Sequence, residues 1–332
     1  MSEQNSPLIN EAFVNELYTE VFGKSPDNVE QITGQGFVNQ VYKVNICDEV
    51  YIIKLRKGLR AYNEFLKEKF CCKQAEKVEI LTAKAICVDK YKDVPFIVQS
   101  YIDGVNGSLC PDKSELIWTA LGKYAKLLHS IDVKGYGFNI KDDDNGIFHN
   151  YAVDIKDYTD VSDYFYNSFN PTLKSHIEYN ISCINQEDEF IKMGVYTVEN
   201  INQIREAFTS LLDINFELGL IHGDMSLKNT IINGDKIFLI DFGGAGVGIV
   251  PFQEFIWIER NTEKEFEIFR EAYGISNETF KYNERMYYIL AMLSEFDRLR
   301  WATYHGIDAP WHVPNTKRSF NNFINVKNNI LF

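Results

Sequence analysis

The chain has 332 residues, of which 45% are apolar and 24% charged, a balance typical of globular proteins with a substantial core. Lys and Arg number 34 against 47 Asp and Glu, so the formal net charge is −13 with the six His counted as neutral. This balance argues against nucleic acid as a main partner, because binding a polyanion needs clustered cations. An acidic surface is instead typical of soluble proteins and suits a cationic small ligand.

Cysteine usage and targeting patterns favour a cytoplasmic protein. The six cysteines include no Cys-x-x-Cys pair, so they are expected to be reduced and mostly buried thiols. The N-terminus lacks the cationic and apolar stretches of a secretory signal. No uncharged apolar run reaches the roughly 18 residues of a membrane span, so no membrane partner is expected.

The first hundred residues predict an antiparallel sheet. An amphipathic helix is expected over 7–22, because apolar residues recur there at intervals of three and four before Gly23. Short β-branched and aromatic runs predict strands over 29–33, 38–46, 50–55, 85–88 and 95–101. A helix over 60–77 separates the third strand from the fourth. We therefore expect one sheet crossed by one helix.

Helical periodicity dominates beyond Gly104. Helices are expected over 113–130, 158–169, 172–184, 199–218, 252–260, 263–273 and 284–304, with a short terminal helix. Asn233-Gly234 between two apolar runs predicts a β-hairpin, and the segment 135–150 is the best candidate for a mobile surface loop. The fold class is therefore α+β, with a β-rich part over 1–102 and a mainly helical part over 103–332. A ligand is expected in the cleft between them.

Three polar residues form the densest chemical constellation. Asp224 and Asn229 are close in sequence, and the predicted hairpin would fold Asp241 back beside Asn229. Two oxygen ligands and one further carboxylate are the smallest set that can hold Mg²⁺ on a nucleotide while a hydroxyl loses its proton.

The same residues carry a family resemblance. The run from His222 to Asn229 matches HxDxxxxN, and Asp-Phe-Gly follows at Asp241. The sequence thereby resembles the protein-kinase-like superfamily and, within it, small-molecule kinases of the aminoglycoside phosphotransferase and choline kinase type. The resemblance implies a protein-kinase-like two-lobed fold that uses ATP, with GTP left open, and Mg²⁺. It also implies that Asp224 is the catalytic base, that Asn229 and Asp241 hold the metal, and that His222 packs beneath the loop.

Such a fold also needs a phosphate-binding turn and a lysine. The turn after the first strand carries Gly34 and Gly36, whose backbone N–H groups can approach phosphates, although Asn39 stands where protein kinases have a third glycine. Lys54 resembles the lysine of the kinase VAIK strand. Arg56 shares its strand face and is the alternative phosphate contact.

The lysine requires a carboxylate partner on the next helix. The sequence that leads from this helix into the next strand resembles the family's pattern, and this resemblance selects Glu68 as the partner. Glu64, one turn earlier on the same helix face, is the alternative. The strand over 95–101 resembles the hinge of these enzymes. Adenine would then bond the backbone of Ser100 and Ile102.

Missing features favour a small-molecule acceptor. Gly223 stands where regulated protein kinases have an Arg, and no long activation segment fits after Asp241. Among hydroxyl acceptors an aminoglycoside-like antibiotic leads, and the C-terminal half offers acids and aromatic rings for such a polycation: Glu254, Glu259, Glu295, Asp297, Trp257 and Trp301. Choline, a sugar or amino alcohol, and a macrolide stay open.

A pseudokinase and a protein kinase are the alternatives to a small-molecule kinase. A pseudokinase without turnover is disfavoured because the motif residues are complete. A protein kinase is disfavoured because the activation segment is absent. The sequence does not indicate the oligomeric state.

Overall fold

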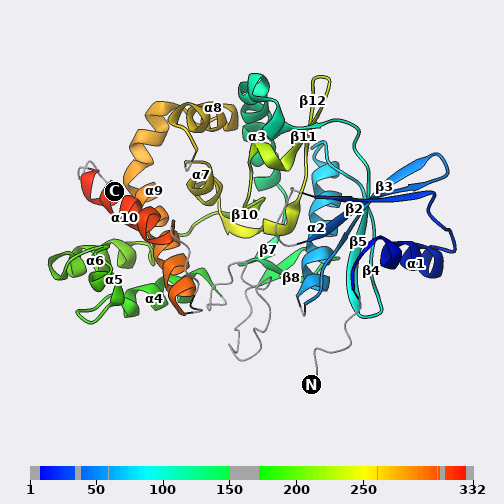
Figure 1. The fold of residues 1–332 in the computed structure, drawn as a ribbon. Helices are drawn as coiled ribbons and strands as arrows, with labels where there is room; N and C mark the ends of the chain where they lie inside the picture. The colour runs from blue at the N-terminus through cyan, green and yellow to red at the C-terminus, as the bar shows by residue number, and fades with distance from the viewer. Residues whose placement is uncertain are drawn as a thin grey trace.

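Two lobes of different composition make up the molecule (Figure 1). The computed structural model describes residues 8–33, 39–58, 60–149, 172–259, 261–304, 306 and 311–326. The smaller lobe is an antiparallel sheet with two helices, and the larger lobe is mainly helical. This arrangement confirms the predicted α+β, two-lobed fold.

The smaller lobe is built on five antiparallel strands in the order β1-β2-β3-β5-β4. They are β1 (Asn28–Ile32), β2 (Gln40–Ile46), β3 (Glu49–Leu55), β4 (Ala85–Tyr91) and β5 (Val94–Ser100). The central strand β3 pairs with β2 on one side and β5 on the other, where Lys54 lies opposite Ile97. The sheet therefore places Lys54 in its middle rather than at an edge.

Helices α1 (Glu11–Phe22) and α2 (Ala61–Lys77) cover opposite faces of this sheet (Figure 1). Side chains alternate along β5, so Phe96 and Val98 pack in the cluster that includes α1, whereas Ile97 packs with Phe65 of α2. Residues 70–72 of α2 belong to the core of the larger lobe. Helix α2 is therefore shared by both lobes.

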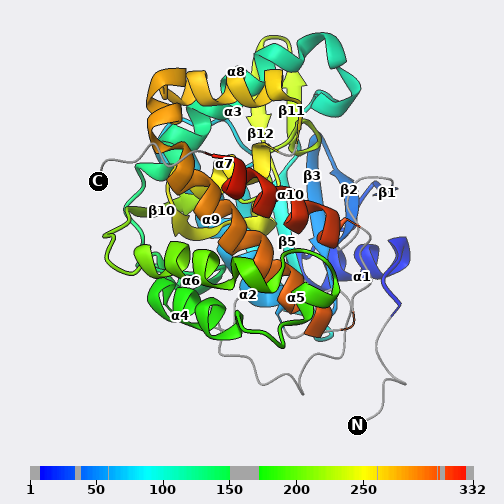
Figure 2. The ribbon, with the colours of Figure 1, turned by 90° about the vertical axis from the view of Figure 1, so that its left-hand side faces the viewer.

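Helices make up most of the larger lobe (Figure 2). Their buried side chains form a core that is rich in aromatic residues. The helices within the described residues are α3 (Ser114–His129), α4 (Leu173–Cys183), α5 (Glu189–Lys192), α6 (Ile201–Ser210), α7 (Phe252–Ile258), α8 (Glu263–Tyr273), α9 (Asn277–Tyr304) and α10 (His312–Asn325). α3 packs against α8, and α9 against α10. None of the helices in the described part of the chain has the length and apolar character needed to cross a membrane.

Short strands tie the loops of the larger lobe together. β10 (Leu218–Ile221) pairs antiparallel with β13 (Gly246–Ile249), and β11 (Thr230–Asn233) pairs with both β12 (Lys236–Leu239) and β6 (Val105–Asn106). β9 (Ile147–His149) lies between β7 (Lys134–Gly135) and β8 (Asn139–Asp142). The predicted hairpin is confirmed, with Gly234 in its two-residue turn at φ 59°.

Several sequence predictions were wrong in detail. The helix expected over 199–218 ends at Ser210, since Asp213 and Asn215 favour turns and the chain then enters β10. The expected loop over 135–150 holds three strands, and Gly137 exchanges backbone hydrogen bonds of 3.0 and 2.8 Å with Val247. The helix expected over 284–304 begins earlier, at residue 277.

The prediction of mostly buried cysteines was also wrong. All six are free thiols, but only Cys71 and Cys72 are buried. Both lie on α2, where that helix enters the core of the larger lobe. The helix expected over 158–169 and the glycine turn at 34–36 lie outside the described residues.

Candidate active site

The loop from His222 to Asn229 connects β10 to the hairpin of β11 and β12. After the hairpin, the N–H of Ile240 donates to the carbonyl of Asn229 at 3.0 Å. The backbone just before Asp241 therefore lies beside Asn229, as the Asn-Gly turn predicted. Asp241 itself has φ 65°, in the left-handed region, and a short 3-10 helix (Phe242–Gly244) follows it. The hairpin therefore brings the two ends of the motif together.

His222 and Glu254 hold this loop in place through hydrogen bonds to its backbone. His222 is fully buried, donates from Nε2 to the carbonyl of Ile240 at 3.1 Å and accepts the N–H of Asp224 on Nδ1 at 3.3 Å. Burial lowers the pKa of His222, which agrees with a neutral ring that donates on one nitrogen and accepts on the other. Glu254 on α7 accepts the N–H groups of His222 at 2.8 Å and Gly223 at 3.2 Å. The expected structural position of His222 is thus observed.

Gly223 is required by close packing. Its φ is +75°, and a Cβ at this position would lie 2.2 Å from the carbonyl oxygen of Gly244. A larger residue here would push apart the Asp224 loop and the segment after Asp241. The glycine that replaces the arginine of protein kinases therefore has a steric reason in this fold.

Asp224 presents its carboxylate to solvent beside two fixed neighbours. Its side chain is 46% exposed, and Oδ2 accepts from Nδ2 of Asn229 at 2.9 Å and lies 3.2 Å from Nζ of Lys228. Nδ2 of Asn229 also donates to the backbone carbonyl of Asp224 at 2.7 Å. The carboxylate is held in place yet stays accessible, as a group that takes a proton from an incoming hydroxyl must be.

Lys54 lies between two carboxylates. Its Nζ is 2.7 Å from Oε1 of Glu68 and 3.2 Å from Oδ1 of Asp241. Burial opposes the charge on Lys54, but attraction by Asp241 and Glu68 outweighs burial and raises the pKa of Lys54. The same ammonium holds the pKa of Asp241 below its usual value. Lys54 and Asp241 are therefore charged at neutral pH, whereas burial raises the pKa of Glu68 and the attraction of Lys54 opposes that rise.

Arg56, the alternative to Lys54, has a partner of its own. Its Nη2 lies 2.6 Å from Oε2 of Glu64, the fallback carboxylate, and no ion pair in the described part of the chain joins either residue to Asp241. The structure therefore brings Lys54 and Glu68, rather than Arg56 and Glu64, to Asp241.

The oxygen donors of Asn229 and Asp241 suit Mg²⁺, which usually binds one or two carboxylates together with phosphate and water oxygens. The Asp241 side chain is 42% exposed and carries a lowered pKa, so it remains an anionic donor within reach of a ligand. Within the described part of the chain, no group of three His, Cys, Asp or Glu side chains is arranged to hold a metal. The donor set therefore fits an ion that arrives with phosphate oxygens.

The expected hinge residues end β5. The N–H of Ser100 donates to the carbonyl of Lys84 at 2.9 Å, so Ser100 can offer a base only its carbonyl oxygen. Ile102 is buried two residues later. Gly34 and Gly36, the expected phosphate-binding glycines, lie outside the described residues.

Sequence reasoning missed two buried charged residues next to this site. Lys67 on α2 donates to two backbone carbonyls of the larger lobe, and Glu254 was expected at an acceptor surface rather than under the loop. The burial of both could have been predicted from helical spacing. Lys67 lies three and four residues before the buried Phe70 and Cys71, and Glu254 lies four residues before the buried Ile258. Helical periodicity thus placed both on apolar faces.

The expected acidic acceptor surface is not observed. Glu254, Glu295 and Asp297 are buried, at 0%, 4% and 2% exposure, and Trp301 is buried as well. The ring of Trp257 lies under the guanidinium of Arg298, 3.9 Å from its centroid. Glu259 is only partly buried and accepts a hydrogen bond from the hydroxyl of Tyr287, so these four acids do not form an exposed anionic surface.

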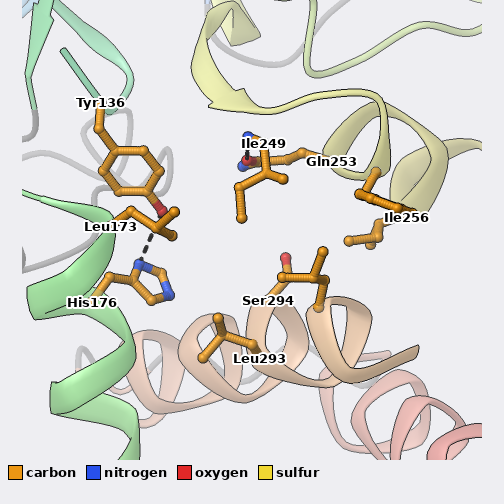
Figure 3. A pocket seen from close by; sticks show the side chains of 10 residues that line it. Tyr136, Leu173, His176, Ile249, Gln253, Ile256, Leu293 and Ser294 are labelled. Atoms are coloured by element: carbon orange, nitrogen blue, oxygen red, sulfur yellow. Dashed lines mark hydrogen bonds between the residues drawn. The ribbon is translucent and has the colours of Figure 1, made fainter. Parts of the chain in front are cut away.

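A pocket lies between α4, α7 and α9 (Figure 3). Most of its lining is apolar, from Leu173, Ile249, Phe252, Ile256, Leu290 and Leu293, and its polar members are Tyr136, His176, Gln253 and Ser294. The hydroxyl of Tyr136 is 3.3 Å from Nδ1 of His176, the contact drawn in Figure 3. Gln253 precedes Glu254, which anchors the Asp224 loop, so the pocket borders the same helix as the candidate site.

Comparison with known proteins agrees with this geometry. A sequence model described as the phosphotransferase enzyme family matches residues 29–288. The chain belongs to the phosphotransferase enzyme family. No curated protein matches this phosphotransferase at a significant level.

Solved structures share the fold of this phosphotransferase at low sequence identity. Aminoglycoside phosphotransferase APH(4)-Ia is 12% identical with a TM-score of 0.62, covering 94% of this chain and 99% of that chain. The GDP complex of a mutant aminoglycoside 2′-phosphotransferase-IIIa is 15% identical with a TM-score of 0.61, covering 95% and 98%. Spectinomycin phosphotransferase APH(9)-Ia with ADP and spectinomycin is 14% identical with a TM-score of 0.55, covering 97% and 99%. The protein-kinase-like fold and the family membership together identify a small-molecule kinase.

Proposed function

We propose that this protein transfers the γ-phosphoryl group of ATP to a hydroxyl group of a small molecule. The observation that carries the proposal is the arrangement of Lys54 between Glu68 and Asp241, with the accessible carboxylate of Asp224 beside Asn229. The enzymes APH(4)-Ia and APH(9)-Ia, whose fold this chain shares, have been crystallised with AMP-PNP and ADP respectively. A GDP complex of a third neighbour leaves GTP as an alternative donor.

Each candidate residue has a proposed role. Asp224 accepts the proton of the acceptor hydroxyl, and Lys54, oriented by Glu68, contacts the phosphates. Asn229 and Asp241 are the proposed ligands of Mg²⁺. The chemistry that Mg²⁺ supplies when bound is neutralisation of the charge on the transferred phosphoryl group.

The nucleotide is proposed to lie in the smaller lobe, over residues 1–102, with the acceptor site in residues 103–332. Gly34 and Gly36 would contribute backbone N–H groups to the phosphates. Ser100 and Ile102 would bond the base through their backbone, Ser100 with its carbonyl because its N–H is already engaged.

Aminoglycoside-like antibiotics are the first proposed class of acceptor, supported by family membership and by the aminoglycoside and spectinomycin phosphotransferases among the structural neighbours. Burial of Glu254, Glu295 and Asp297 weakens the charge argument for a polycation, since only Glu259 of the four expected acids is partly exposed. The mainly apolar pocket beside α7 favours an acceptor with apolar surface, such as a macrolide, as the second class.

The test is ATP consumption against a panel of aminoglycosides, choline, sugars, amino alcohols and macrolides. Asp224→Asn should abolish phosphoryl transfer to the active compound while AMP-PNP binding is kept. Asp235→Asn, in the exposed hairpin turn, is the control and should leave both unchanged. Near-normal turnover by Asp224→Asn would contradict the assignment. Stabilisation by MgATP without any phosphorylated product would favour a nucleotide-binding pseudokinase.

A further inference from the structure

Lys67 is a charged side chain buried where the two lobes meet. It precedes Glu68 on α2 and is only 3% exposed. Its Nζ donates to the carbonyl oxygens of Phe138 and Gly243, each at 2.8 Å. No ion pair within 4.0 Å includes Lys67 in the part of the chain that the structure describes. Since a buried ammonium is costly without hydrogen-bond partners, these two carbonyls are what accommodate it.

Both acceptors of Lys67 belong to segments that lead to the candidate site. Gly243 follows Asp241 by two residues in the same turn. Phe138 follows Gly137, which is hydrogen-bonded in both directions to Val247 of β13. One ammonium group thus ties α2 to the Asp241 turn and to the backbone segment packed on the strand after it.

The backbone at Asp241 needs such support. Its φ of 65° lies in the left-handed region, which non-glycine residues adopt at a cost and keep only when the surroundings hold them there. Lys54 holds the side chain of Asp241, and Lys67 holds the carbonyl two residues later. Consecutive residues of α2 therefore act on this turn, Glu68 through Lys54 and Lys67 directly.

We propose that Lys67 is a positioning residue for phosphoryl transfer, which fixes the Asp241 carboxylate by holding Gly243 and Phe138 against α2. This inference rests on the proposed function, in which Asp241 binds the metal on the nucleotide. An apolar side chain could fill the same space but would remove the hydrogen bonds that Lys67 donates to the carbonyls of Phe138 and Gly243. The lysine is therefore needed for its N–H groups and not for its volume.

The test compares wild type with Lys67→Met, which keeps the length and removes the donors, and Lys67→Gln, which restores a shorter donor. Lys73→Met, at an exposed position of the same helix, is the matched control. AMP-PNP affinity is measured by calorimetry with Mg²⁺ and with a chelator. Hydrogen exchange of residues 241–249 is followed without nucleotide, and unfolding is followed by denaturant.

We expect the gain in AMP-PNP affinity on adding Mg²⁺ to fall about tenfold in Lys67→Met, because supporting contacts of this kind tune metal ligands by that order. Affinity in chelator should be unchanged, exchange over 241–249 should accelerate, and Lys67→Gln should recover part of both effects. Lys73→Met should behave as wild type.

Three results would overturn the inference: a folded Lys67→Met protein with the wild-type response to Mg²⁺ and wild-type exchange, no recovery in Lys67→Gln, or failure of both variants to fold, which marks a purely structural residue. If wild type itself shows no Mg²⁺-dependent AMP-PNP binding, the proposed function fails. The exchange measurement still reports whether Lys67 holds the Asp241 turn in that case.

Discussion

Glu254 lies fully buried under the Asp224 loop and is predicted to make the stability of the protein depend on pH. Burial raises the pKa of its carboxyl from 4.5 to about 7, although the N–H groups of His222 and Gly223 partly oppose this. His129, whose Nε2 is 4.0 Å away, does not supply a positive charge because burial lowers its pKa to about 3. The Glu254 carboxyl therefore titrates near neutrality in the folded protein.

The sign follows from proton binding. Between pH 4.5 and about 7 the folded protein keeps a proton on Glu254 that the unfolded chain has lost, so unfolding releases a proton and rising pH favours it. The contribution of Glu254 to stability is complete below pH 4.5 and is lost as pH rises through about 7. A difference of roughly 2.5 pKa units corresponds to about 3 kcal/mol.

The perturbation is Glu254→Gln, which keeps the shape and cannot ionise. Urea unfolding of both proteins from about pH 5 to about pH 8 gives the difference between their free energies of unfolding. The contributions of all other titrating groups cancel in this difference. We expect wild type to lose about 2.5 kcal/mol relative to the variant as pH rises across this range, because part of the full effect already falls below pH 5. The exposed Glu267→Gln serves as the control. A difference that does not change with pH, or that changes in the opposite direction, would refute the reasoning.

Two further predictions concern the same site. Lys54→Met should lower the free energy of unfolding by about 3 kcal/mol, as measured with denaturant. This is the lower end for a broken buried ion pair, because Gln99 still donates a hydrogen bond to Glu68. The double variant Lys54→Met with Glu68→Leu should recover most of this loss. Recovery of nothing would mean that the loss does not arise from an uncompensated carboxylate. Gly223→Ala should cost about 2–4 kcal/mol and abolish phosphoryl transfer, because its Cβ would meet the Gly244 carbonyl at 2.2 Å. Gly234→Ala, with φ +59° and nothing within 4 Å of the added Cβ, should cost about 1 kcal/mol, and equal losses at both glycines would contradict the steric argument.

Local pattern was enough to predict much of the fold and the position of the motif residues. The five strands, the helix between the third and the fourth, and the Asn-Gly hairpin could all be predicted from short-range signals. Strand alternation could not decide between Lys54 and Arg56, since both point to α2. Both lysine and arginine find a partner on α2, in the pairs Lys54–Glu68 and Arg56–Glu64. The spacing explains this, because four residues of a helix rise about 6 Å and two residues of a strand about 7 Å, so the two carboxylates are as far apart as the two cations.

What the sequence could not predict depends on contacts between distant segments. β10 and β13 are four residues each and exist through their pairing with one another, which no local signal reports. The hydrogen bonds of Glu254 to the Asp224 loop likewise follow from where α7 packs. The acceptors of Lys67 could not be predicted either, because they are backbone carbonyls 71 and 176 residues away in the chain.

The route of the chain after Asp241 has a consequence for control of the protein. Three residues of 3-10 helix lead at once into β13, whose four residues all pair with β10, and α7 begins at Phe252. From Asp241 to Ile258, all within the described residues, the backbone is committed to secondary structure or to tight connections. A covalent mark placed between Asp241 and Ile258 would therefore find no free segment to order or release. Control by such a mark would have to act on another part of the chain.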